Sequence, residues 1–179
     1  CFGNTMPPAL LIPLMAIAAI AAGMVWGLIP AIFKANFNTN ETLFTLMMNY
    51  IALQITSFCV SKWENPYGSN TVGIINPTTN AGWFPSIFGQ QYMLNVIIVV
   101  LIAVAMYLYL KYSKQGFEIA VVGESMNTAR YAAINVKRVI IRTVMISGAI
   151  CGIAGFIAVA GAGHTISTST AGGRGFTAI

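Results

Sequence analysis

The chain alternates long apolar runs with shorter polar segments. Four runs, at about 9–33, 42–60, 92–110 and 139–162, consist largely of hydrophobic residues. Because about 20 apolar residues carry a helix across the hydrocarbon core of a bilayer, each run predicts a transmembrane span. For the first run, a helix buried in a soluble core is the alternative. We therefore expect an all-α, polytopic membrane protein with about four transmembrane helices.

Composition supports the membrane interpretation. Of the 179 residues, 57% are hydrophobic and only 7% are charged, whereas soluble domains carry roughly 25% charged residues. So few charges cannot cover the surface of a water-soluble globule. The net charge of +5 does not indicate nucleic-acid binding, because the basic residues lie beside apolar runs rather than on a polar face. The partner expected from composition is the lipid bilayer.

Most basic residues lie in one connecting segment. Six of the nine Lys and Arg residues are Lys111, Lys114, Arg130, Lys137, Arg138 and Arg142. Short loops rich in Lys and Arg stay in the cytoplasm, so we expect 111–138 to be a cytoplasmic loop. The loop at 61–91, rich in Asn, Gly, Pro and Thr, is then an outer loop, and the turn at Lys34 is again cytoplasmic.

A short helix is expected inside this cytoplasmic loop. Ser125 is a good N-cap for a helix over Met126–Ile134. Small residues at 129, 132 and 133 share one side of that helix and would let another surface approach closely. An amphipathic helix lying on lipid headgroups is the alternative.

The run GFEIAVVGESMNTARYAAINVKRVIIRTVMISGAICGIAG, residues 116–155, resembles the permease subunits of bacterial ABC importers, in the branch for simple sugars and nucleosides. The resemblance implies that the short helix is a coupling helix, which docks on a separate ATP-binding subunit. The residues that match the family pattern are Gly123, Glu124, Asn127, Ala129, Arg130, Tyr131, Ala132, Ile134 and Asn135.

Four positions in this run depart from the family pattern. Ala120 stands where the family usually has Arg, and Ser125 where it has Asn. Met126 replaces Pro, and Ala133 replaces Gly. These departures bear on the geometry of the start of the short helix.

Further candidates lie in or beside the spans. The resemblance also covers Asn49 and Tyr50 in the second span and Gly173, Gly175 and Phe176 near the end of the chain. Asn49 could line a pathway or make a hydrogen bond between helices. Helix packing is expected along Gly148, Gly152 and Gly155 in the fourth span. A second packing face is expected along Ala18, Ala22 and Trp26 in the first span.

Catalysis is not expected. The sequence has no phosphate-binding loop, and four acids with one histidine do not form an acid–base pair or a metal site. His164 alone is better explained as a hydrogen-bonding loop residue, so we expect no metal and no cofactor. The resemblance implies that ATP is hydrolysed by a partner subunit.

We expect 1–179 to be a single permease domain, an internal fragment of a longer protein in the bacterial cytoplasmic (inner) membrane. The resemblance implies three protein partners: the ATP-binding subunit, a second permease subunit and an extracytoplasmic substrate-binding protein. The solute would be sugar-like or nucleoside-like. An ion-coupled secondary transporter and a membrane scaffold without transport remain alternatives.

Overall fold

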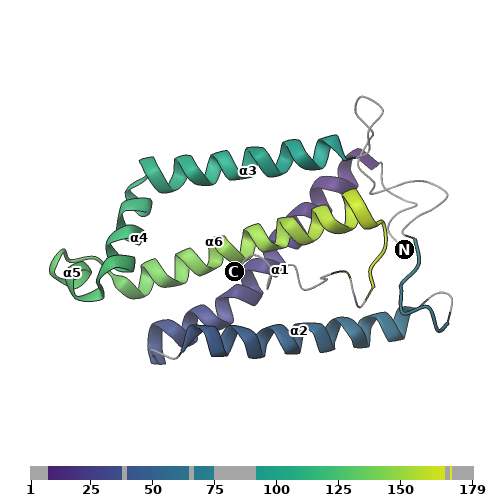
Figure 1. Ribbon diagram of the computed structural model, residues 1–179, viewed down its shortest axis with the longest axis horizontal. Helices are drawn as coiled ribbons and strands as arrows, with labels where there is room; N and C mark the ends of the chain where they lie inside the picture. Colours follow the sequence, from purple (N-terminus) through teal and green to yellow (C-terminus); the bar gives the residue numbers. More distant parts are fainter. Residues whose placement is uncertain (1–7, 38–39, 65–66, 75–91, 168–169, 171–179) are drawn as a thin grey trace.

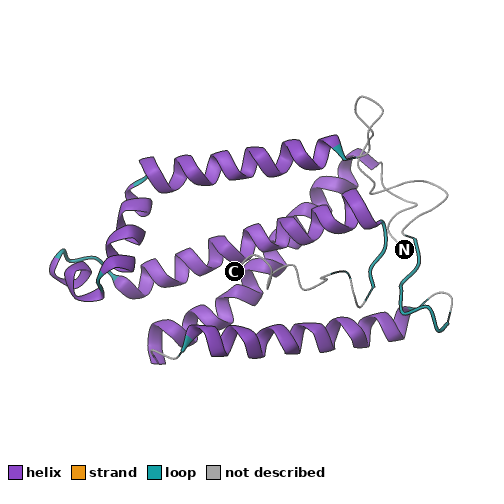
Figure 2. Ribbon diagram, viewed as in Figure 1, coloured by secondary structure: helices purple, strands orange, loops and turns teal. Residues whose placement is uncertain are grey.

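The computed structural model describes residues 8–37, 40–64, 67–74, 92–167 and 170. Within these ranges the regular secondary structure is helical, and turns and loops join the helices, with one isolated β-bridge between Thr71 and Ser167 (Figures 1 and 2). The helices are α1 (Pro8–Phe37), α2 (Glu41–Trp63), α3 (Met93–Tyr112), α4 (Lys114–Glu124), α5 (Met126–Tyr131) and α6 (Val136–Ile157), which a π-helical turn (Ala158–Gly163) extends.

Four of these segments are long and apolar enough to cross a membrane: Leu10–Phe37, Thr42–Trp63, Met93–Tyr112 and Val136–Gly161. The expectation of an all-α, polytopic membrane protein is therefore confirmed. Figure 1 shows α1 running obliquely across α6, whereas α2, α3 and α6 lie roughly along the long axis. A 30-residue helix such as α1 is about 45 Å long and would span a bilayer of ordinary thickness with tilt.

Polar side chains define where four helices begin. The side chain of Asn40 accepts a hydrogen bond from the backbone of Thr42, and Ser113, Ser125 and Asn135 start α4, α5 and α6 in the same way. Each cap satisfies a backbone N–H that has no partner within its helix. Asn135 places the start of α6 at Val136, three residues before the predicted start of the fourth span.

Pro30 lies inside α1, which continues through it to Phe37; neighbouring groups can compensate for the lost hydrogen bond in membrane helices. One expectation about a helix end was wrong. The short loop helix was predicted to reach Ile134 but ends at Tyr131. The reason is Ala133, whose φ of 58° is left-handed and cannot continue a right-handed helix.

The central contact of the fold is between α1 and α6, where small residues bring the two backbones together. A Cβ added at Gly148 would lie 2.5 Å from the carbonyl oxygen of Gly23, and one at Gly27 would lie 3.2 Å from that of Val144. Gly152 packs against the carbonyl group of Ala19 in the same way. Two glycine pairs spaced four apart, 23 with 27 and 148 with 152, therefore form the seam.

The face of α1 expected to pack was therefore misplaced by one residue. Ala18, Ala22 and Trp26 are exposed, whereas Ala19, Gly23 and Gly27 lie against α6. The prediction relied on alanines and an aromatic residue, but only glycines allow carbonyl oxygens to approach so closely.

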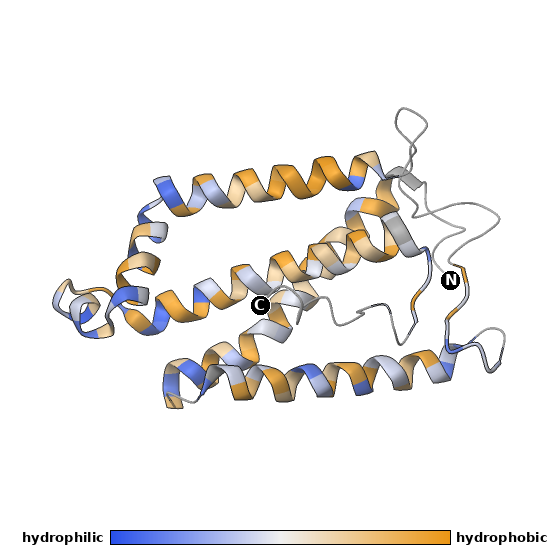
Figure 3. Ribbon diagram, viewed as in Figure 1, coloured by the Kyte–Doolittle hydropathy of each residue, from blue (hydrophilic) through white to orange (hydrophobic). Residues whose placement is uncertain are grey.

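Helices α2 and α3 flank this pair. Phe33 of α1 stacks on Phe44 of α2 with ring centroids 4.9 Å apart. Near its start, α3 packs Asn95 on Gly161 of the π-helical turn. Figure 3 shows that α3 is apolar over most of its length, and no residue of this helix is buried. Such a surface would meet lipid or further membrane helices, because water would not solvate it.

The connecting segments gather at two opposite ends of the helices (Figure 1). At one end, Val72 donates its backbone N–H to Ile166 at 3.0 Å, joining the segments that follow α2 and α6. At the other end lie α4, α5 and the end of α1. Six basic residues belong to this second end: Lys34, Lys111, Lys114, Arg130, Lys137 and Arg138.

Candidate coupling surface

Two short helices lie at the basic end, between residues 111 and 138, where one short helix was expected within a loop. The helix missed by sequence reasoning is α4, which turns sharply away from α3 at Ser113 (Figure 1). Gly116 is buried in that turn, and a Cβ there would collide with the carbonyl group of Leu110. The capping serine followed by this glycine was the available signal for the turn.

Helix α5 has six residues and is held by hydrogen bonds within its own segment. Ser125 caps it through the backbone N–H of Thr128 at 3.3 Å. At its other end, Ile134 donates its N–H to the carbonyl oxygen of Ala129 at 3.0 Å. Ser125 thus performs the capping that the family's Asn would perform, since both side chains accept a hydrogen bond. The helix begins at Met126 although the family has Pro there.

The residues of this segment that match the family pattern differ in how exposed their side chains are. Tyr131 is 93% exposed and projects a large aromatic ring into the surroundings. Ala129 is fully buried, so it packs inside the loop and does not face an approaching surface. Ile134 is half-buried. The other matched positions are exposed: Gly123, Glu124, Asn127, Arg130, Ala132 and Asn135.

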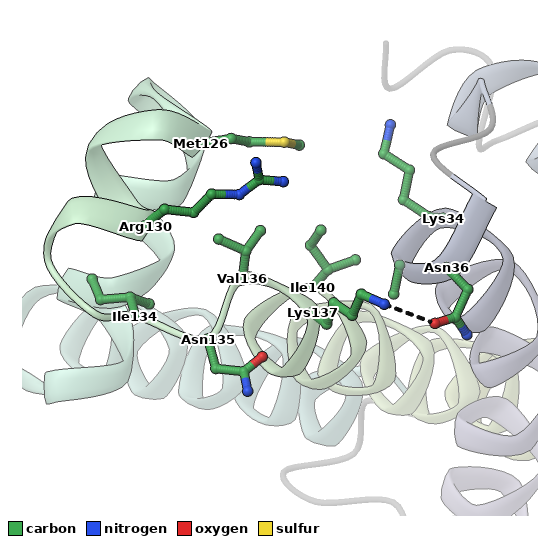
Figure 4. A pocket seen from close by; sticks show the side chains of 10 residues that line it. Lys34, Asn36, Met126, Arg130, Ile134, Asn135, Val136, Lys137 and Ile140 are labelled. Carbon is green, nitrogen blue, oxygen red and sulfur yellow. Dashed lines mark hydrogen bonds between the residues drawn. The ribbon is translucent and has the colours of Figure 1, made fainter.

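A pocket of about 480 Å³ lies between α5, the start of α6 and the end of α1. In Figure 4, Met126 and Arg130 extend from α5 towards α1, where Lys34 rises opposite them. Lys137 donates a hydrogen bond from Nζ to Oδ1 of Asn36 at 3.4 Å, linking α6 to α1 (Figure 4). The end of α1 is thus part of the same surface as α5, which sequence reasoning did not foresee.

The candidates for pathway or helix packing lie on different elements. Asn49 and Tyr50 are on α2, half-buried and exposed respectively. Gly148 and Gly152 form the seam with α1, but among the described residues no atom beyond the adjoining helix backbone lies within 4 Å of a Cβ built at Gly155. Gly173, Gly175 and Phe176 lie outside the described residues.

A polar contact near the opposite end was also missed. The π-helical turn (Ala158–Gly163) ends at His164, whose φ is 48° and whose backbone N–H donates to Val159 at 2.9 Å. Asn95 packs on Gly161 within this turn. The glycine-rich sequence at 161–163 was the available signal. In the part of the chain that the structure describes, no group of three or more His, Cys, Asp or Glu could hold a metal ion.

Residues 2–179 match the family described as branched-chain amino acid transport system / permease component. The chain belongs to this family. Its residues 116–155 had already indicated an importer permease of the simple sugar and nucleoside branch, and that resemblance is confirmed. The chain is a multi-pass membrane protein of a transport-permease family.

Three curated relatives are similar to this chain. The guanosine ABC transporter permease protein NupP of Bacillus subtilis is 36% identical over 83% of this chain and 43% of its own length. The nucleoside ABC transporter permease protein NupB of Lactococcus lactis is 28% identical over 85% and 44%. The glucose ABC transporter permease protein TsgB13 of Haloferax volcanii is 26% identical over 98% and 49%.

The chain therefore spans slightly less than half the length of the curated relatives it matches. No solved structure matches it.

Proposed function

We propose that this chain forms part of the transmembrane permease of an ABC importer that moves nucleosides, with ATP hydrolysed on a separate subunit. The observation that carries the proposal is α5, a capped helical turn that exposes Tyr131 at the basic end of the membrane helices. Membership of the permease family and 36% identity to a permease named for guanosine support it.

The proposed orientation of the chain in the membrane follows from the distribution of its basic residues. Basic loops remain in the cytoplasm, so the end that carries α4 and α5 faces the ATP-binding subunit in a bacterial cytoplasmic membrane. The opposite end, where residues 71–72 pair with 166–167, faces outward to the substrate-binding protein. A second permease subunit completes the pathway.

The route of coupling would pass through α6 to α1. Helix α5 connects to α6 by a tight turn at Ala133, and α6 contacts α1 backbone to backbone. Because helices packed this closely cannot slide without clashes, a displacement of α5 would move α6 and α1 together as a rigid pair.

Docking of the ATP-binding subunit on α5 can be tested by substituting two tyrosines that are similarly exposed but lie at opposite ends of the helices. Tyr131 is 93% exposed on α5, and Tyr67 is 96% exposed near the opposite end. We expect Tyr131→Ala to weaken retention of the ATP-binding subunit by roughly 5- to 30-fold, corresponding to about 1–2 kcal/mol, since exposed aromatic residues dominate many interfaces. Tyr67→Ala should leave retention unchanged. Affinity purification of the full-length permease with its partners measures both.

The exposed Ala132 offers a second variant at the same surface. Ala132→Trp should block docking sterically while the permease remains folded. Ala129→Trp is not informative about docking, because Ala129 is fully buried and the larger side chain would disrupt the loop itself. If Tyr131→Ala and Ala132→Trp both retain the ATP-binding subunit as well as the native protein does, α5 is not the docking element.

The solute is tested by uptake into proteoliposomes that contain the full transporter. We expect ATP-dependent uptake of labelled guanosine that unlabelled nucleosides suppress and glucose does not. Suppression by glucose would assign the chain to sugars. Uptake that persists without ATP and stops when an ion gradient is collapsed would instead indicate a secondary transporter.

A further inference from the structure

The pocket beside α5 collects positive charge from three separate elements. Lys34 comes from α1, Arg130 from α5 and Lys137 from α6, and no acid is among the ten residues that line it. The hydrogen bond from Lys137 goes to the neutral amide oxygen of Asn36, so it leaves the lysine charge uncompensated. An anion is the ligand chemistry that complements this lining.

The rest of the lining is apolar. Met126, Ile134, Val136 and Ile140 face the same pocket, and the last two belong to the first turns of the membrane-crossing α6 (Figure 4). The pocket therefore has a charged side and an apolar side, and the start of α6 contributes residues to both. A ligand that fills it must carry an anionic group beside an apolar part.

The pocket also lies where a membrane surface would be. Lys34 is in the last turn of α1 and Lys137 in the first turn of α6. Basic side chains at the ends of membrane helices extend to the headgroup region. The phosphates of the adjacent leaflet would lie at this level.

We propose that this pocket binds the phosphate group of an anionic phospholipid from the leaflet on the α5 side. The three cations would hold the phosphate, and the glycerol and upper acyl chains would cover Val136 and Ile140. An acidic side chain from a soluble partner fits less well, because it would satisfy the cations and leave the apolar wall uncovered. Basic pockets between membrane helices are a recurrent form of anionic-lipid recognition.

The test compares two double variants that remove the same charge at the same end. Lys34→Gln with Lys137→Gln alters the pocket. Lys111→Gln with Lys114→Gln is the control, since neither residue lines the pocket. The full-length transporter in detergent is titrated with phosphatidylglycerol or phosphatidylcholine of identical acyl chains, and binding is followed by native mass spectrometry. Each cation near a membrane surface is worth roughly five-fold in affinity.

We therefore expect the pocket variant to bind phosphatidylglycerol roughly 30-fold more weakly, while the control keeps most of its preference over phosphatidylcholine. The charge-preserving pair Lys34→Arg with Lys137→Arg should also keep that preference, which separates loss of charge from misfolding. Equal losses in the pocket and control variants would overturn the proposal. So would unchanged lipid binding with release of the ATP-binding subunit, which would make an acid of that subunit the occupant. Neither lipid result depends on the proposed transport of nucleosides.

Discussion

At the scale of single residues, Ala133 determines where α5 ends. Its φ of 58° lies in the left-handed region, which costs a residue with a Cβ roughly 1–2 kcal/mol. The backbone N–H of Ala133 bonds to Arg130, and that of Ile134 bonds to Ala129, so the turn closes the helix and directs the chain into α6. The family usually places Gly at this position, and the structure supplies the physical reason.

Ala133→Gly should raise the free energy of unfolding by about 0.5–1 kcal/mol, because Gly adopts a left-handed φ without steric cost and the gain is offset in part by the greater entropy of its unfolded state. Chemical unfolding of the purified permease in mixed micelles measures it. The neighbouring Ala132→Gly is the control. With φ at −78°, it should lower stability by about 0.5–1 kcal/mol. Equal effects at the two positions would contradict the assignment of strain to Ala133.

At the scale of elements, the seam between α1 and α6 holds the two helices at backbone contact. Its close approach depends on the missing side chains of Gly23, Gly148 and Gly152, because a Cβ at each would meet a carbonyl oxygen of the other helix. Van der Waals contact of this kind associates helices in lipid, where the hydrophobic effect contributes little.

Gly148→Ala should destabilise the permease by about 1–3 kcal/mol, because the added methyl group lies 2.5 Å from the carbonyl oxygen of Gly23 and forces the helices apart. Gly155→Ala is the matched control on the same helix. Its Cβ would meet no neighbouring element within 4 Å in the part of the chain that the structure describes, so the substitution should leave stability unchanged or raise it by up to about 1 kcal/mol through helix propensity. Thermal unfolding of the two variants in detergent makes the comparison. Similar losses would mean that the seam does not determine stability.

At the scale of the whole molecule, the separation of its two ends carries the proposed function. The four membrane-crossing helices place α4 and α5 with most of the basic residues at one end and the paired segments at 71–72 and 166–167 at the other. A transporter needs this polarity, because energy from ATP enters on one side of the membrane and solute on the other.

The sidedness can be tested with single cysteines in a background whose three native cysteines are replaced by serine. Cysteine at Tyr131 should react with an impermeant maleimide only in inside-out vesicles, and cysteine at Tyr67 only in intact cells. Both positions are more than 90% exposed in the chain itself, so the permease is labelled without the ATP-binding subunit, which would otherwise cover Tyr131. Labelling of the Tyr131 position from outside the cell would reverse the proposed topology.

The sequence alone was sufficient for the four membrane-crossing helices and for the family, although it did not reveal α4. Apolar runs long enough to cross a bilayer core predict spans wherever they occur, and residues 116–155 carried the resemblance to the family. The cap at Ser125 could also be predicted, because an N-cap acts within its own turn and needs no distant partner.

Three features were decided only by the tertiary structure, because they depend on contacts between residues that lie far apart in the sequence. Sequence reasoning chose Ala18, Ala22 and Trp26 although Gly23 and Gly27 lie four apart, and only the fold shows that Gly23 and Gly27 are the residues that meet Gly148 of α6. It could not show that Ala129 is buried while Tyr131 is exposed, since both lie in one six-residue helix. Nor could it bring Lys34 beside Arg130 and Lys137, because that pocket exists only when α1 and α6 cross.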